Sequence, residues 1–169
     1  GNDDKQTFHL DSGQRVVDFV LQPRTYYDVN QENYGKKTTV TITDTLSEYL
    51  TYREHSAYFG GVYQQSEKDG AQGTVTGGVQ TEPQIIKNEN GTQTLIWEIH
   101  DVTVGEAMEP IYYSVNIGKK GNPKDDVPEG TTSLKNTVRI STDTDRREPS
   151  LANRNYAEAG FTVVRGSAG

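Results

Sequence analysis

Apolar and polar residues alternate with a period of two along most of this chain, and this alternation constrains the fold more than any other feature. Successive side chains of a β-strand point to opposite faces, so alternation is typical of a strand with one buried face. No segment has the apolar spacing of an amphipathic helix. Clear alternation predicts strands at residues 15–22, 38–46, 94–100, 110–118, 134–141 and 161–165, and weaker patterns predict strands at 49–54, 74–79 and 83–87.

The residue types agree with this pattern. Thr, Val, Ile and Tyr together number 53, whereas Leu and Ala supply 7 each. β-branched and aromatic side chains suit a pleated sheet, while Leu and Ala are common in helices. An Asn90-Gly91 pair between two strand-like segments predicts a hairpin. We therefore expect an all-β, antiparallel β-sandwich of seven to nine strands.

One domain is expected, at residues 8–165, because no internal repeat is present; residues 1–7 and 166–169 are interpreted as linkers or cloning remnants. Its core should contain the apolar residues that share one face of each strand. These are Phe19, Val40, Ile42, Leu95, Trp97, Ile99, Tyr113, Val115, Leu134, Val138 and Phe161.

Composition excludes several classes of protein. The chain has 169 residues and no cysteine, which excludes a disulfide scaffold and a zinc ribbon. Its net charge of −7, without a basic cluster, argues against nucleic-acid binding. No apolar run approaches the length needed to cross a bilayer, so we expect no membrane contact by this segment.

Several short segments, in a fixed order, resemble one family. Residues 40–46 (VTITDTL) and 49–52 (YLTY) resemble a "VTDTLP-x-GLTY" signature, and residues 91–99 (GTQTLIWEI) resemble a "TLTW-x-I" strand. Residues 101–106 resemble a "L-x-x-GES" turn, and residues 134–140 (LKNTVRI) an "LTNTATV" strand. Asn153, Asn155, Ala157 and the segment 161–164 are similar to a closing "NN-x-A…V-x-V" motif.

These motifs belong to DUF11-like and isopeptide-forming repeat domains of Gram-positive surface proteins. Two departures from the pattern are Ser47-Glu48, in place of Pro-x-Gly, and an insertion at residues 29–37. The resemblance implies an immunoglobulin-like sandwich at the cell surface or wall. It also implies a non-enzymatic stalk or spacer module of an adhesin, with neighbouring domains of the same protein as partners and no cofactor.

Many modules of this family join a Lys to an Asn by a spontaneous isopeptide bond, assisted by an acidic residue. Asp44 and Asn136 share the parity of core residues, so both should point inward. The candidates are Asn136 or Asn155 as electrophile, Asp44 as acid, and Lys5 or Lys36 as nucleophile. The alternative is that Asp44 and Asn136 only form hydrogen bonds with backbone groups.

Acidic loops suggest a weaker hypothesis, a calcium site. Asp143, Asp145 and Glu148 lie close in sequence, and Asp125-Asp126 form a second pair. Calcium needs six to eight oxygen ligands, but Arg146-Arg147 would oppose a cation here. The preferred interpretation is therefore no metal and a solvated charged loop.

Aromatic residues outside the core pattern suggest an alternative function. Exposed loop aromatics can form a platform for a host protein or glycan. The candidates are Tyr26, Tyr27, Tyr34, Tyr58, Phe59 and Tyr63. No nucleotide-binding or nucleophile motif indicates an enzyme.

Overall fold

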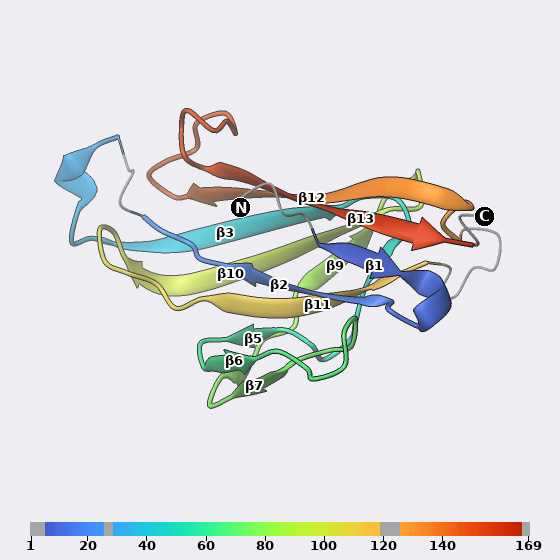
Figure 1. Cartoon of the computed structure of the whole chain (residues 1–169). Helices are drawn as coiled ribbons and strands as arrows, with labels where there is room; N and C mark the ends of the chain where they lie inside the picture. The colour runs from blue at the N-terminus through green and yellow to red at the C-terminus, as the bar shows by residue number, and fades with distance from the viewer. Residues whose placement is uncertain (1–5, 26–28, 119–125, 167–169) are drawn as a thin grey trace.

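The computed structural model describes residues 6–25, 29–118 and 126–166, and its regular structure is almost entirely β (Figure 1). Two short 3-10 turns, Leu10–Ser12 and Gln31–Asn33, are the helical segments within those residues. None of the described helices is long and apolar enough to reach across a bilayer. The strands are β1 (Thr7–His9), β2 (Val16–Leu21), β3 (Lys37–Leu46), β4 (Leu50–Tyr52), β5 (Tyr58–Phe59), β6 (Val62–Gln64), β7 (Thr74–Thr76), β8 (Val79–Gln80), β9 (Gln84–Lys87), β10 (Gln93–Thr103), β11 (Ile111–Ile117), β12 (Gly130–Thr142) and β13 (Tyr156–Arg165).

The strands form two main sheets that pack face to face. Sheet A has the order β1-β13-β12-β3-β10-β9; sheet B has the order β2-β11-β5-β8, with β4 also paired to β11. The chain crosses repeatedly from one sheet to the other, which is the connectivity of a sandwich. The expected all-β, immunoglobulin-like antiparallel sandwich is confirmed. One pair departs from antiparallel order, because β1 runs parallel to β13.

All nine predicted strand segments contain a strand, but the described residues form thirteen strands rather than seven to nine. The additional strands are β1, β5, β6 and β8. Each has only two or three residues, and so short a segment cannot establish a period of two. The Asn90-Gly91 turn forms as predicted between β9 and β10: Asn88 N–H donates to Thr92 C=O at 2.8 Å, and Gly91 has φ of 86°.

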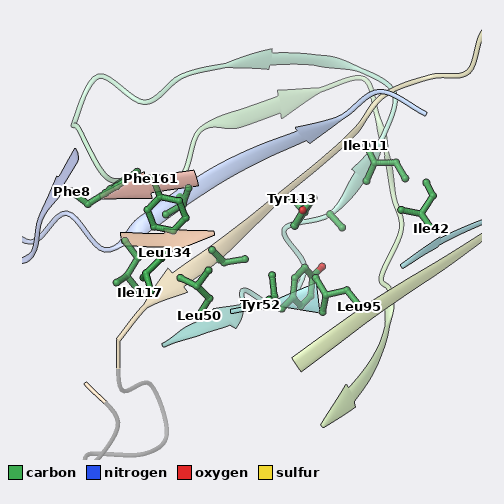
Figure 2. Packing of buried hydrophobic residues seen from close by; sticks show 14 of the residues in the cluster. Phe8, Ile42, Leu50, Tyr52, Leu95, Ile111, Tyr113, Ile117, Leu134 and Phe161 are labelled. Atoms are coloured by element: carbon green, nitrogen blue, oxygen red, sulfur yellow. The ribbon is translucent and has the colours of Figure 1, made fainter. Parts of the chain in front are cut away.

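The core lies between the two sheets (Figure 2). Trp97 of sheet A and Tyr113 of sheet B pack with ring centroids 5.1 Å apart. Phe8 and Phe161 form an edge-to-face pair at 5.5 Å. Every residue predicted for the core belongs to this cluster or packs against it.

Part of the outer face of sheet B is also covered, which the alternation on β11 did not predict. The β6–β7 hairpin lies against this face, and Tyr63 stacks on Tyr112 with ring centroids 5.6 Å apart. Ser114 and Asn116 should point to solvent by parity, but both are buried. Arg53 donates to the Asn116 side chain at 2.6 Å, and Ser114 N–H donates to Ser56 Oγ at 3.0 Å.

Candidate functional site

A cluster of three polar side chains lies buried between the two sheets. Asp44 comes from β3, Asn136 from the neighbouring strand β12, and Tyr113 from β11 of the opposite sheet. The register places Val138 opposite Asp44 and Asn136 opposite Leu46, so Asp44 and Asn136 share the inner face of sheet A. All three residues are at most 1% exposed. The predicted inward orientation of Asp44 and Asn136 is therefore confirmed.

Hydrogen bonds join the three side chains. The Tyr113 hydroxyl donates to Asp44 Oδ2. Asn136 Nδ2 donates to Asp44 Oδ2 at 3.1 Å and to the Tyr113 hydroxyl oxygen at 2.6 Å. Among the described residues, Asp44 Oδ1 and Asn136 Oδ1 have no partner. Buried polar atoms without a partner are rare in folded proteins, so this pair of acceptors lacks a donor.

The apolar surroundings change the acidity of this cluster. Burial raises the pKa of Asp44 to about 7, although hydrogen bonds from Tyr113 and Asn136 act in the opposite direction. Burial and the nearby Asp44 carboxylate raise the pKa of Tyr113 well above its ordinary range. Near neutral pH, a substantial fraction of Asp44 is therefore protonated. A neutral acid beside a carboxamide can donate a proton to the amide oxygen, which is the chemistry that isopeptide formation needs.

The other isopeptide candidates lie elsewhere. Lys36 is exposed, and its Nζ contacts Asn33 Oδ1 at 3.4 Å in the segment before β3. Asn155 Nδ2 donates to the carbonyl of Arg147 at 3.0 Å, in the loop before β13. Lys5 lies outside the described residues, and every lysine within them is exposed. The structure thus brings Asp44 and Asn136 together, and places Lys36 and Asn155 away from them.

Tyr113 is the member of the cluster that sequence reasoning missed as a polar group. Its parity with Ile111 and Val115 identified it only as a core residue. The signal available was the residue type itself, because a buried tyrosine hydroxyl usually has a hydrogen-bond partner.

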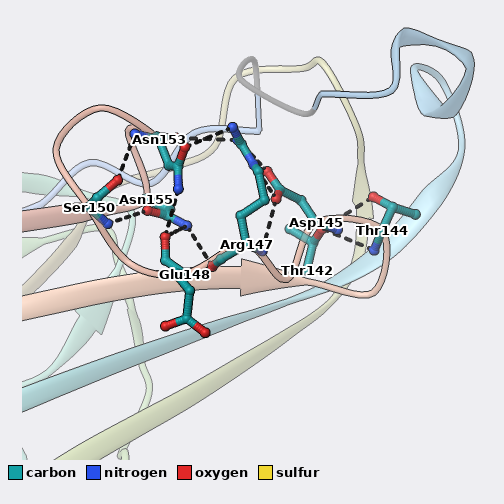
Figure 3. A network of polar contacts seen from close by, with 8 residues as sticks. All are labelled: Thr142, Thr144, Asp145, Arg147, Glu148, Ser150, Asn153 and Asn155. Carbon is teal, nitrogen blue, oxygen red and sulfur yellow. Dashed lines mark hydrogen bonds and ion pairs between the residues drawn. The ribbon is translucent and has the colours of Figure 1, made fainter.

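The acidic loop proposed as a calcium candidate is organised by arginine (Figure 3). Arg147 forms a two-point ion pair with Asp145, with both N···O distances 2.8 Å. This hydrogen bonding lowers the pKa of Asp145. Asp143 accepts from Thr39 N–H at 3.2 Å, and Glu148 is exposed. Within the described part of the chain, no three His, Cys, Asp or Glu side chains are grouped as a metal site would require.

In the second acidic pair, Asp125-Asp126, the described residue Asp126 is also paired with arginine. Asp126 accepts from Arg15 at 3.1 and 3.3 Å, and lies 3.6 Å from Arg165. The hydrogen bonds from Arg15 are the main reason that the pKa of Asp126 is lowered. Asp125 lies outside the described residues.

The candidate binding aromatics do not form one platform. Tyr34 packs against Gly105, where an added Cβ would lie 3.2 Å from its ring. Tyr58 and Phe59 form β5, which pairs with β11 and β8, and Phe59 packs against the core. Tyr63 lies on the β6–β7 hairpin. Tyr26 and Tyr27 lie outside the described residues.

Comparisons with known proteins give similarity at the level of fold. No protein-family model and no curated protein matches the chain. Among solved structures, the collagen-binding domain of a Staphylococcus aureus adhesin is 13% identical over 89% of each chain, with a TM-score of 0.43. The collagen-binding subdomain of an Enterococcus faecalis surface protein is 10% identical over 94% of this chain and 93% of that chain, with a TM-score of 0.43. The major subunit of Escherichia coli type I aggregative adherence fimbriae is 13% identical over 95% of this chain and 89% of that chain, with a TM-score of 0.30. Similarity this low does not transfer a function.

Proposed function

We propose that this chain is a non-enzymatic spacer module of a bacterial cell-surface protein, connected to neighbouring domains and exposed outside the cell. The observation that carries the proposal is the parallel pairing of β1 with β13. Thr7 lies opposite Thr162, Phe8 opposite Val163 and His9 opposite Val164. The first and last strands of the described fold are therefore hydrogen-bonded neighbours.

Parallel terminal strands resist tension well for a geometric reason. Force that enters before β1 and leaves after β13 pulls the two strands in opposite directions along their length. The hydrogen bonds between parallel strands lie across this direction, so they are loaded together in shear rather than one at a time. Phe8 strengthens this clamp, because its ring is buried against Phe161. A module placed in series in a stalk needs this resistance.

Single-molecule force spectroscopy tests the proposal, with the chain placed between two marker domains. Phe8→Ala should lower the unfolding force strongly, because it weakens the attachment of β1. Leu95→Ala is the matched control, since Leu95 is buried on β10 outside the clamp. If Leu95→Ala lowers the force as much per unit of lost stability, the clamp is not the force-bearing element and the proposal fails. Antibody labelling of intact source cells tests the surface location.

We further propose that an isopeptide bond reinforces this module. The Asp44–Asn136 arrangement supports Asn136 as electrophile and Asp44 as acid, and Lys5 is the remaining candidate for the nucleophile. Lys5 Nζ would attack Asn136 Cγ, a C–N bond would form, and the Asn136 amide nitrogen would leave as ammonia. The two unpartnered acceptors, Asp44 Oδ1 and Asn136 Oδ1, are the atoms that would take part in the proton transfers. Such a bond would anchor the N-terminal segment to β12 covalently.

A further inference from the structure

A second polar site lies away from the buried cluster, beside the edge of sheet B. A cavity of about 210 Å³, open to solvent, is lined by β1, β2 and the segment from β6 towards β7. Polar side chains dominate its wall: Gln6, Asp18, Tyr63, Gln65 and Lys68. Two neighbouring strands near the N-terminus and a segment about 50 residues further along the chain thus bring their polar groups to one cavity.

Part of this wall is held rigidly. The Tyr63 hydroxyl and Gly73 N–H both donate to Asp18 Oδ2, the latter at 2.9 Å. Ser114 Oγ donates to Asp18 Oδ1 at 2.5 Å. Burial and the Asp18 carboxylate raise the pKa of Tyr63 well above its ordinary range, so its hydroxyl remains a donor. Asp18 and Tyr63 therefore keep one geometry before any ligand arrives, which reduces the entropy lost on binding.

Gly70 shows how closely the segment between β6 and β7 is fitted to the chain before β2, because an added Cβ at Gly70 would lie 2.4 Å from Gln14 Cβ. Gly73 packs within the hairpin itself, where an added Cβ would lie 2.5 Å from the Tyr63 ring. Gly70 C=O also accepts from Val16 N–H at 3.0 Å. The hairpin is thus held against β2, and the cavity is a fixed feature of the fold.

The remaining polar groups of the cavity are available to a ligand. The side chains of Gln6, Gln65 and Lys68 form no hydrogen bond or ion pair with any described residue. Together they offer amide donors, amide acceptors and an ammonium group. Val16, which is half-buried, adds a small apolar surface to the same wall, whereas Phe8 is almost completely buried. Polar groups that converge on one cavity can fix the orientation of a small polar ligand.

We propose that this cavity binds one neutral sugar unit, such as the terminal residue of a glycan. Adjacent hydroxyl groups of a sugar match the paired donor and acceptor of each glutamine amide. An anionic ligand is disfavoured, because Asp18 carries negative charge in the wall and Lys68 is flanked by Glu67 and Asp69. The volume is below the roughly 300–1,000 Å³ typical of drug-sized ligands, so it suits a single monosaccharide. This site goes beyond the spacer function and does not depend on it.

Titrations followed by NMR test the site, with glucose, galactose, mannose and N-acetylglucosamine as neutral probes and glucuronate as the charged comparison. We expect at least one neutral sugar to shift the amide signals of Gln65, Lys68 and Gly70 in a saturable way. The double variant Gln65→Ala/Lys68→Ala should weaken that binding at least tenfold. The matched control is Gln84→Ala/Lys87→Ala, which removes the same residue types from the exposed strand β9 and should leave binding unchanged.

Three outcomes would overturn the proposal. The first is that no neutral probe binds at millimolar concentration. The second is binding that the cavity variant leaves intact, which would place the sugar elsewhere on the molecule. The third is tighter binding of glucuronate than of the neutral sugars. The force measurement on the β1–β13 clamp is unaffected by any of these results, so the two proposals stand or fall separately.

Discussion

The hydroxyl of Tyr113 in sheet B donates a hydrogen bond to the carboxylate of Asp44 in sheet A, between two side chains that are almost completely buried. This bond joins the two sheets at a point where the surrounding contacts are apolar. The bond also holds the Asp44 carboxyl group in place. Burial raises the pKa of Asp44 further than that of any other carboxyl group in the described residues.

Removing the Tyr113 hydroxyl should destabilise the fold. Tyr113→Phe keeps the ring against Trp97. It removes the hydroxyl that donates to Asp44 and that accepts a hydrogen bond from Asn136 Nδ2. A buried group left unsatisfied costs about 1–3 kcal/mol, and we expect the free energy of unfolding to fall by this amount. Urea denaturation measures it. Tyr112→Phe, on the same strand and with no hydrogen bond from its hydroxyl to a described residue, should change the stability little; equal losses in both variants would contradict the prediction.

Asp44 should make stability fall as pH rises. Its pKa is raised from an ordinary 3.8 to about 7, so the folded state binds its proton more tightly than the unfolded state does. This residue's contribution is most favourable below about pH 4 and is lost progressively until about pH 7. Asp126 and Asp145 contribute with the opposite sign, because arginine lowers their pKa values and acidification therefore removes their stabilisation.

The contribution of Asp44 can be isolated with the variant Asp44→Asn. The free energy of unfolding of each protein is measured from pH 4.5 to pH 8. The difference between wild type and variant should shift in favour of the variant as pH rises, and then level off. A difference that does not depend on pH would show that Asp44 titrates normally.

An isopeptide bond would reveal itself in the intact mass. The wild-type chain should weigh less than its sequence requires by one molecule of ammonia, because bond formation expels the Asn136 amide nitrogen. Asn136→Ala and Lys5→Arg should each have the full mass of their sequence. Asn155→Ala and Lys36→Arg should still lose ammonia, since the structure places both residues away from Asp44. An unmodified wild-type mass removes the proposed bond.

The loop at residues 143–155 should loosen when its arginine is removed. Arg147 pairs with Asp145 and also donates to the side chain and backbone of Asn153, at 3.4 and 3.3 Å. Arg147→Ala leaves these acceptors without their donor, and we expect faster amide hydrogen exchange across the loop by at least tenfold. Arg146→Ala is the control. The Arg146 side chain is 76% exposed, and its ion pair with Asp143 is long, at 3.7 Å. Similar exchange in both variants would mean that Arg147 does not organise the loop.

The sequence by itself determined the fold class, the long strands and the inward face of each. A period of two is a local property, so it identified Asp44 and Asn136 as buried without knowledge of their neighbours. The same local rule did not reveal β1, β5, β6 and β8, which have only two or three residues each. Nor could it show that Ser114 and Asn116 are buried on the opposite face, because nothing in β11 shows that the β6–β7 hairpin covers that face.

Only the tertiary structure decided which polar groups meet. Asp44 and Asn136 become neighbours because β12 pairs with β3, and Tyr113 reaches them because sheet B packs over sheet A. Lys36 shares the parity of Asp44 but precedes β3, and no periodicity could show that its amine turns to Asn33 at the surface. Likewise, Asp18 and Tyr63 meet because the hairpin is held against β2 by contacts between distant segments. Alternation specifies which face of a strand is buried, whereas sheet order and sheet packing specify what lies opposite it.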